Sequence, residues 1–143
     1  MPLRISRREQ DGIAIIRLEG RLTFGEGDTI LNDEIRHVLA SRRIRLIIDL
    51  GSVDKIDSAG VGTLLYARAE LRKAGGALAL ANLRPAHMET LLRAKLETVF
   101  NVYRTEQDAV NSFFPDRTTP HYDLLELLTA VRQTRAHDLK RAS

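Results

Sequence analysis

The chain contains no cysteine and few aromatic residues, and each shortage excludes a class of function. Without cysteine it can form neither disulfides nor cysteine-ligated zinc sites, and it has no thiol nucleophile; this composition fits a reducing compartment. Aromatic residues make up only 5% of the 143 residues, so the sequence lacks the interleaved rings and cations of surfaces that stack nucleic-acid bases. These absences argue against a disulfide-bonded protein and against a nucleic-acid partner.

Long apolar runs and metal-ligating patterns are also missing. No run approaches the roughly 20 apolar residues that cross a bilayer, and the N-terminal Met-Pro-Leu-Arg lacks the core of a signal peptide. The four histidines, at His37, His87, His121 and His137, show no spacing typical of a metal site. Acids and bases are interspersed, and we interpret the densest basic cluster, residues 42–45, as a solvated loop. We therefore expect a cytoplasmic protein with no membrane insertion, metal or other cofactor.

Recognisable catalytic patterns are absent as well. The sequence has neither the glycine-rich fingerprint of dinucleotide binding nor that of a phosphate-binding P-loop. Ser58 lies in Asp-Ser-Ala-Gly, not in Gly-x-Ser-x-Gly, and no histidine is recognisable as its base. Asp49, Asp54 and Asp57 suggest a Mg²⁺ cluster like that of phospho-acceptor receiver domains, but those domains place paired acids after the first strand. The sequence therefore predicts a protein without catalytic activity.

The most informative stretch covers residues 44–74. Residues 44–50 are apolar and rich in branched side chains, which predicts a strand buried on both faces. A polar connector, 51–57, leads to Ser58, and the apolar spacing over 59–74 predicts a helix that ends at two glycines. We expect Ser58 to cap this helix, with its hydroxyl accepting hydrogen bonds from backbone N–H groups one turn in.

Patterns elsewhere complete an α/β domain. The further predicted strands are 3–10, 13–18, 77–81 and 99–103. The further predicted helices are 28–40, 85–94, 105–114 and 121–137. Asp11-Gly12 is a hairpin signal, and Asp28 and Thr105 are suitable helix starts. The order predicts a mixed β-sheet of four to five strands with helices packed mostly on one face, because strand–helix–strand crossovers make the middle strands parallel.

The chain divides into three predicted parts. We assign residues 1–114 to the domain, the proline-bounded segment 115–120 to a linker, and 121–143 to an amphipathic helix with a frayed end. The tail helix carries a stripe of apolar residues, namely Leu124, Leu125, Leu127, Leu128 and Val131. Because burying each leucine is worth roughly 1.5–3 kcal/mol, we expect this stripe to dock on its own domain as a cap or on a second copy as a homodimer. A separate regulatory role for the tail is the other alternative.

The stretch around Ser58 also carries a family pattern. An apolar strand ends in Asp49-Leu50, and a loop then leads to Ile56-Asp57-Ser58-Ala59-Gly60-Val61-Gly62. This pattern resembles the signature of STAS domains, the family that includes bacterial anti-sigma factor antagonists. Residue types, spacing and element order agree over residues 3–114, and the tail after Pro115 lies outside the resemblance.

The resemblance implies a non-catalytic phospho-switch. Antagonists of this family are phosphorylated on the serine that follows the motif aspartate, here Ser58. The modifying enzyme is an anti-sigma factor that is also a serine kinase, and a serine phosphatase reverses the reaction. The unmodified antagonist binds the kinase and frees a sigma factor. The partner-binding residues implied here are Arg21, Leu22, Thr23, Asp57, Ser58, Ala59, Gly60 and Val61.

Two departures and several alternatives accompany the resemblance. Many antagonists have an acidic residue where this chain has Thr23, which suggests a different kinase, and Ala59 leaves Ser58 as the sole hydroxyl at this place. Ser58 could instead be an ordinary helix cap, and Gly60 and Gly62 could serve packing rather than a partner. The alternative function is a structural STAS subunit of a stressosome-like signalling assembly or a lipid-transport assembly, where the same surface docks permanently.

Overall fold

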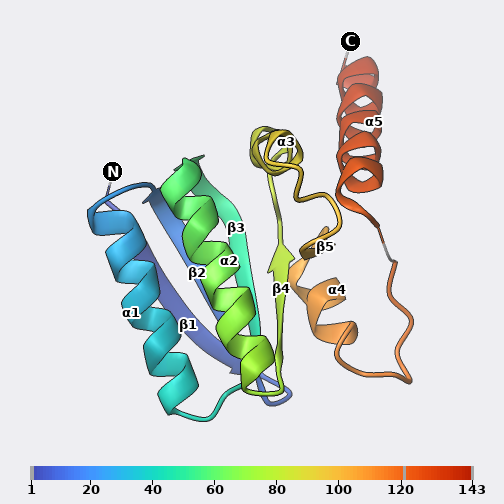
Figure 1. Cartoon of the computed structure of the whole chain (residues 1–143). Helices are drawn as coiled ribbons and strands as arrows, with labels where there is room; N and C mark the ends of the chain where they lie inside the picture. The colour runs from blue at the N-terminus through green and yellow to red at the C-terminus, as the bar shows by residue number, and fades with distance from the viewer. Residues whose placement is uncertain (1, 121, 143) are drawn as a thin grey trace.

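The computed structural model describes residues 2–120 and 122–142 and shows a mixed five-stranded sheet in that part of the chain (Figure 1). The strands are β1 (Arg4–Gln10), β2 (Ile13–Leu22), β3 (Arg45–Ile56), β4 (Ala77–Ala81) and β5 (Asn101–Tyr103). The helices are α1 (Glu26–Ala40), α2 (Ser58–Lys73), α3 (Pro85–Arg93), α4 (Glu106–Asn111) and α5 (Leu124–Ala142). His121 and Ser143, which bound the predicted tail segment, lie outside the described residues.

The strands lie in the sheet in the order in which they occur in the chain. β1 pairs antiparallel with β2 through the predicted Asp11-Gly12 turn, whose φ angles of 55° and 82° fit the tight hairpin that this dipeptide favours. β2, β3, β4 and β5 are parallel, because a helix between consecutive strands carries the chain back to the starting edge. The predicted mixed sheet with parallel middle strands is confirmed.

Two hydrophobic layers cover the two faces of the sheet. Successive side chains of a strand point to opposite faces, so Ile16 of β2 packs in the layer with α1, α2, α3 and α5, whereas Ile15 packs in the layer with α4. Figure 1 shows α1 and α2 side by side across the sheet, with α3 and α5 further along. The prediction that helices pack mostly on one face is confirmed.

β2 and β3 extend beyond their predicted ends, and this correction determines where the site lies. β2 runs to Leu22 and β3 to Ile56, and these two last residues pair with each other. The predicted connector 51–57 is therefore mostly strand, because its Val53 and Ile56 side chains are buried while the polar residues between them are exposed. Two register shifts in the β2–β3 pairing accommodate this irregular alternation.

Several helix boundaries also differ from the predicted ones. α1 begins at Glu26 after Gly25, whose φ of 98° suits glycine, and no side chain caps it; the predicted start at Asp28 is wrong. Thr105 does cap α4, because its hydroxyl accepts a hydrogen bond from the Asp108 N–H at 3.0 Å. α4 is shorter than predicted, and α5 is helical up to Ala142, into the end that was expected to be frayed.

A group of paired charges lies between α4 and the sheet, and no sequence pattern indicates it. Glu106 of α4 is buried, and its carboxylate accepts hydrogen bonds from Arg17 of β2 at 2.6 Å and from Arg8 of β1 at 2.5 Å. Burial alone would raise the pKa of Glu106, but hydrogen bonds led by that from Arg17 lower it to about 2. Burial raises the pKa of neighbouring Asp49, which Arg17 reaches only at 3.8 Å.

α5 docks on its own domain through one side of its apolar stripe. Leu124, Leu127 and Leu128 are buried and pack with α3 and β5, whereas Leu125 is 58% exposed. Just before the helix, Tyr122 forms an isolated β-bridge with Val102 of β5. The expected cap on the domain is thus present. A homodimer through α5, and the division of the chain into domain, linker and tail, stay predictions.

The two kinds of leucine in α5 allow a matched test of this docking. Leu127→Ala removes a side chain with no exposed surface, so the free energy of unfolding should fall by about 2–5 kcal/mol. Leu125→Ala, on the same helix, should change it by no more than about 0.5 kcal/mol. Urea unfolding of both variants provides the measurement, and equal effects would contradict the docking of α5 through Leu127.

The Glu106 contacts predict a specific dependence of stability on pH. Because the pKa of Glu106 is lowered in the folded state, its contribution is present above the ordinary value of 4.5 and is lost as the pH falls toward about 2. Glu106→Gln should lower the free energy of unfolding by about 1–3 kcal/mol at neutral pH. Its stability should also decline less than that of the wild type between about pH 5 and pH 3.

Urea unfolding across this pH range measures the effect. The raised pKa of Asp49 acts in the opposite sense, because its contribution is present at low pH and is lost as the pH rises. Glu106 is one cause of that raised pKa, so Glu106→Gln also reduces the opposing contribution of Asp49. The difference between the Glu106→Gln and wild-type curves therefore reports the net effect of both carboxylates, and a smaller decline in the variant shows that the acid-sensitive contacts of Glu106 dominate. Parallel curves for the two proteins would show that Glu106 is not held by Arg17 and Arg8.

Candidate functional site

Helix α2 begins at the end of β3, where Asp57 joins the two elements. Asp57 has an extended backbone, with φ −102° and ψ −174°, and its Oδ1 accepts a hydrogen bond from the Gly60 N–H at 2.9 Å. This geometry makes Asp57 the N-cap and Ser58 the first helical residue, so the prediction that Ser58 caps the helix is wrong. Aspartate and serine are both good caps, and the added length of β3 places the aspartate at the last extended position.

The second carboxylate oxygen of Asp57 holds the loop between β2 and α1. Oδ2 accepts a hydrogen bond from the Phe24 N–H at 2.9 Å, and the Asp57 N–H donates to the Leu22 carbonyl at 3.4 Å. Burial alone would raise the pKa of Asp57, but hydrogen bonds from the backbone N–H groups of Phe24, Gly60 and Ala59 lower it. The carboxylate is therefore charged at neutral pH while it ties the loop to the helix start.

Ser58 presents its side chain to solvent at the positive end of α2. The residue is exposed, and its hydroxyl has no hydrogen-bond partner among the residues that the structure describes. The Gly60 and Ala59 N–H groups already bind Asp57, and the dipole of the helix favours further negative charge at this end. The arrangement offers an accessible hydroxyl, next to a fixed carboxylate, at a position that accommodates added negative charge.

Gly60 and Gly62 differ in what surrounds them. A Cβ on Gly60 would lie 2.2 Å from the Leu22 carbonyl oxygen, so only glycine lets α2 approach the end of β2 this closely. A Cβ on Gly62 would meet nothing within 4 Å, and the residue is exposed. Packing within the chain therefore explains why residue 60 is glycine, but it does not explain why residue 62 is glycine.

The predicted partner-binding residues lie together where the end of β2 meets the start of α2, but they fall into two groups. The exposed or half-buried residues are Arg21, Thr23, Asp57, Ser58 and Ala59. The buried residues are Leu22, Gly60 and Val61. The buried group supports this surface from beneath, and only the first group presents side chains to it. Contact of either group with a partner stays a prediction.

Phe24 belongs to this surface by position, although the sequence pattern did not assign it there. Its side chain is 82% exposed, and its backbone N–H is the group that Asp57 holds. The available signal is an aromatic residue between Thr23 and Gly25, in a loop with no apolar neighbours in the sequence. A single exposed apolar residue is common on protein surfaces, so that signal becomes informative only with the contact to Asp57.

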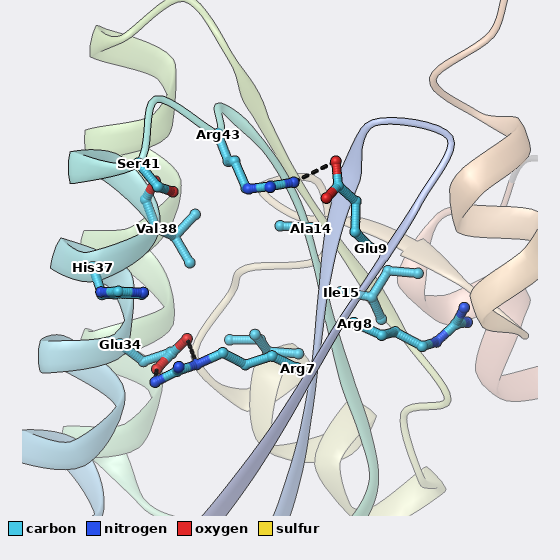
Figure 2. Close-up of a pocket in the computed structure, with 11 residues that line it drawn as sticks. Arg7, Arg8, Glu9, Ala14, Ile15, Glu34, His37, Val38, Ser41 and Arg43 are labelled. Atoms are coloured by element: carbon cyan, nitrogen blue, oxygen red, sulfur yellow. Dashed lines mark hydrogen bonds and ion pairs between the residues drawn. The ribbon is translucent and has the colours of Figure 1, made fainter.

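A cavity of about 320 Å³ lies elsewhere, between β1 and the C-terminal half of α1 (Figure 2). Its floor is apolar, and ion pairs cross it at two places, Arg7 with Glu34 and Arg43 with Glu9. Arg7 Nη2 donates to Glu34 Oε2 at 2.6 Å, whereas Arg7 Nε lies 2.5 Å from Oε1 without hydrogen-bond geometry. These charges neutralise one another, so the cavity does not select a ligand of one charge.

The acidic residues of the central stretch do not form a cluster. Asp49 accepts hydrogen bonds from the Gly51 N–H at 2.8 Å and from Asn82 at 2.9 Å, whereas Asp57 caps α2. Over residues 2–120 and 122–142, no group of three or more histidine, aspartate or glutamate side chains could hold a metal ion. Among the described helices, none combines the length and the apolar character needed to cross a membrane.

Comparisons with known proteins point to one family. The family model described as STAS domain matches residues 4–109. A relative from Bordetella bronchiseptica, BtrV, bears the name of a candidate anti-sigma factor antagonist. The two chains are 26% identical over 111 residues, which cover 78% of this chain and 95% of BtrV.

Solved structures with the same fold include proteins named as antagonists. An anti-sigma factor antagonist from Mycobacterium paratuberculosis has a TM-score of 0.69 at 24% identity, over 77% of this chain and 92% of that one. The Bacillus protein SpoIIAA in its phosphorylated form has a TM-score of 0.60 at 20% identity, over 78% of this chain and 98% of that one. At these identities the structural likeness establishes the fold alone.

The two glycines of α2 predict opposite effects of the same substitution. Gly60→Ala should lower the free energy of unfolding by about 1–3 kcal/mol, because the new Cβ would collide with the Leu22 carbonyl. Gly62→Ala should raise it by about 0.5–1 kcal/mol, because alanine favours the helix and nothing obstructs its Cβ. Urea unfolding of the two variants checks both signs. A destabilised Gly62→Ala protein would contradict the open surroundings of that residue.

Proposed function

The chain belongs to the STAS domain family, and on this basis we propose that it is a non-catalytic anti-sigma factor antagonist, switched by phosphorylation of Ser58. In this proposal the unmodified protein binds an anti-sigma factor that is also a serine kinase, and so frees a sigma factor. The kinase then transfers phosphate to Ser58, and a serine phosphatase restores the unmodified protein. The name of the relative BtrV supports the choice of partner.

The single observation that carries the proposal is the position of the Ser58 hydroxyl. It is exposed, it has no hydrogen-bond partner in the described part of the chain, and it lies at the N-terminus of a helix of 16 residues. A kinase can reach such a hydroxyl without unfolding any element. Neighbouring Ala59 offers no competing hydroxyl.

Electrostatics explains how one phosphate could switch binding without refolding the domain. Phosphorylation adds about −1.5 to −2 charges at neutral pH, and the positive end of the α2 dipole offsets part of them. The phosphate would lie next to the Asp57 carboxylate, whose two oxygens are already engaged by Gly60 and Phe24. The surface therefore becomes strongly negative at one place, and a partner with an acidic or apolar patch there would be repelled.

We predict that a cognate anti-sigma factor kinase with ATP adds one phosphate group to the wild-type protein, detected as the corresponding increase in intact mass. Ser58→Ala should not be modified. Ser58→Asp should bind the kinase more weakly, with an unchanged melting temperature, because an acidic residue in the first turn suits the helix dipole. Intact-mass spectrometry, calorimetric titration and a thermal melt provide the three measurements.

Modification of Ser58→Ala to the wild-type extent would place the phospho-acceptor elsewhere and refute the proposal. A structural role in a stressosome-like or lipid-transport assembly predicts a different result. In that case the chain would remain in a complex of fixed stoichiometry whether Ser58 is serine or aspartate. Size-exclusion chromatography of the two forms with their partners separates these functions. A homodimer through α5 would appear there as well, and among the α5 side chains that the structure describes, Leu125 is the exposed leucine.

A further inference from the structure

The loop between β2 and α1 exposes an aromatic ring on a backbone that is held in place. The Phe24 N–H donates to Asp57 Oδ2 at 2.9 Å, the Asp28 N–H donates to the Thr23 carbonyl at 3.0 Å, and the Thr29 N–H donates to the Gly25 carbonyl at 3.2 Å. Each of the residues that flank Phe24 is thus tied by its own hydrogen bond. The backbone that carries the Phe24 ring is therefore held in place by hydrogen bonds.

Close packing beneath the loop restricts it further. A Cβ on Gly27 would lie 2.5 Å from the Arg21 carbonyl oxygen, so the start of α1 rests directly on the end of β2. A Cβ on Gly60 would likewise collide with the Leu22 carbonyl oxygen from the side of α2. The backbone next to Phe24 is therefore in close contact with the starts of both α1 and α2. The hydrogen bond from the Phe24 N–H to Asp57 fixes the position of Phe24 relative to Ser58.

Despite this support, the Phe24 side chain is 82% exposed. Within the described residues, Tyr66 and Leu125 are the other large apolar side chains counted as exposed, at 37% and 58%. Phe24 is thus the most exposed of the three. It is also the one whose backbone N–H is hydrogen-bonded to Asp57, the residue before Ser58. Buried aromatic anchors carry a large share of the energy in protein–protein interfaces, whereas the charged rim around them contributes less.

We propose that the Phe24 ring inserts into an apolar pocket of the partner that binds at Ser58, and thereby determines which partner is accepted. This inference rests on the proposed function, since it concerns the same partner. The surroundings of the ring define the chemistry of that pocket. Arg21 and Glu26 line a hollow of about 390 Å³ beside Phe24 and are both exposed. The matching pocket is apolar at its centre, with an acidic group opposite Arg21 and a basic group opposite Glu26.

The fixed register gives this anchor a role in the capture of the protein by the kinase. A kinase that has captured the ring finds the Ser58 hydroxyl at a set position, because Asp57 binds the Phe24 backbone and begins the helix that starts with Ser58. Loss of the ring should therefore weaken capture and leave the transfer step itself unaffected. In kinetic terms, KM for the protein substrate rises and kcat does not fall.

The test uses the full chain, the kinase that modifies Ser58, and four proteins: wild type, Phe24→Ala, Phe24→Leu and the matched control Leu125→Ala. We expect Phe24→Ala to raise KM for Ser58 phosphorylation, and Kd in a nucleotide-free titration, by about tenfold or more. Phe24→Leu should recover part of the loss, and Leu125→Ala should match the wild type. Melting temperatures should agree within about 3 °C, because the substituted side chains are exposed.

The possible failures are distinguishable. If the wild type is phosphorylated on Ser58 and Phe24→Ala has the same KM and Kd, the anchor is refuted and the proposed function stands. If Leu125→Ala loses as much affinity as Phe24→Ala, the effect is not specific to the loop, and the anchor is refuted as well. If no cognate kinase modifies Ser58 of the wild type, the proposed function fails, and the inference fails with it.

Discussion

The carboxylate of Asp57 is the contact on which the rest of the site depends. One oxygen caps α2 through Gly60, and the other binds the backbone of Phe24 in the loop before α1. Because Asp57 is also the residue that follows β3, a single side chain joins one strand and two helix starts. Its lowered pKa keeps it charged at neutral pH, so the junction persists wherever the protein is folded under such conditions. These contacts of Asp57 therefore fix the position of the accessible Ser58 hydroxyl.

The helices and strands with a regular spacing of apolar residues were predictable from the sequence. The residues at which they begin and end were harder to predict. Ala77–Ala81 and the Asp11-Gly12 hairpin lie where their patterns placed them, because apolar runs and turn residues act locally. The polar connector after Leu50 proved to be strand, because pairing with β2 overrides its composition. Two adjacent residues, Asp57 and Ser58, both suit a helix cap, and only the length of β3 decides between them.

The charge pairs and the contact between Phe24 and Asp57 could not be predicted, because the residues that meet are far apart in the sequence. Glu106 meets Arg8 and Arg17 across 98 and 89 positions, and Phe24 meets Asp57 across 33. No short-range pattern encodes such a contact. The sequence therefore identified the two segments that form the site. Which of their side chains are exposed became clear only from the folded structure. Leu22 and Val61 illustrate this, since they belong to the predicted segments and are buried.

The strand order of the sheet has a consequence for how the protein is made. Strands β1 to β5 occupy neighbouring places in the order of the chain, so each new strand can add to an edge that already exists. A nascent chain emerging from the ribosome N-terminus first can therefore extend its sheet one strand at a time, without waiting for a later strand to be inserted. The segments around Phe24 and Asp57 precede β4, whereas α5 is synthesised after β5. The surface around Ser58 can thus assemble during translation, before α5 is available to cover α3 and β5.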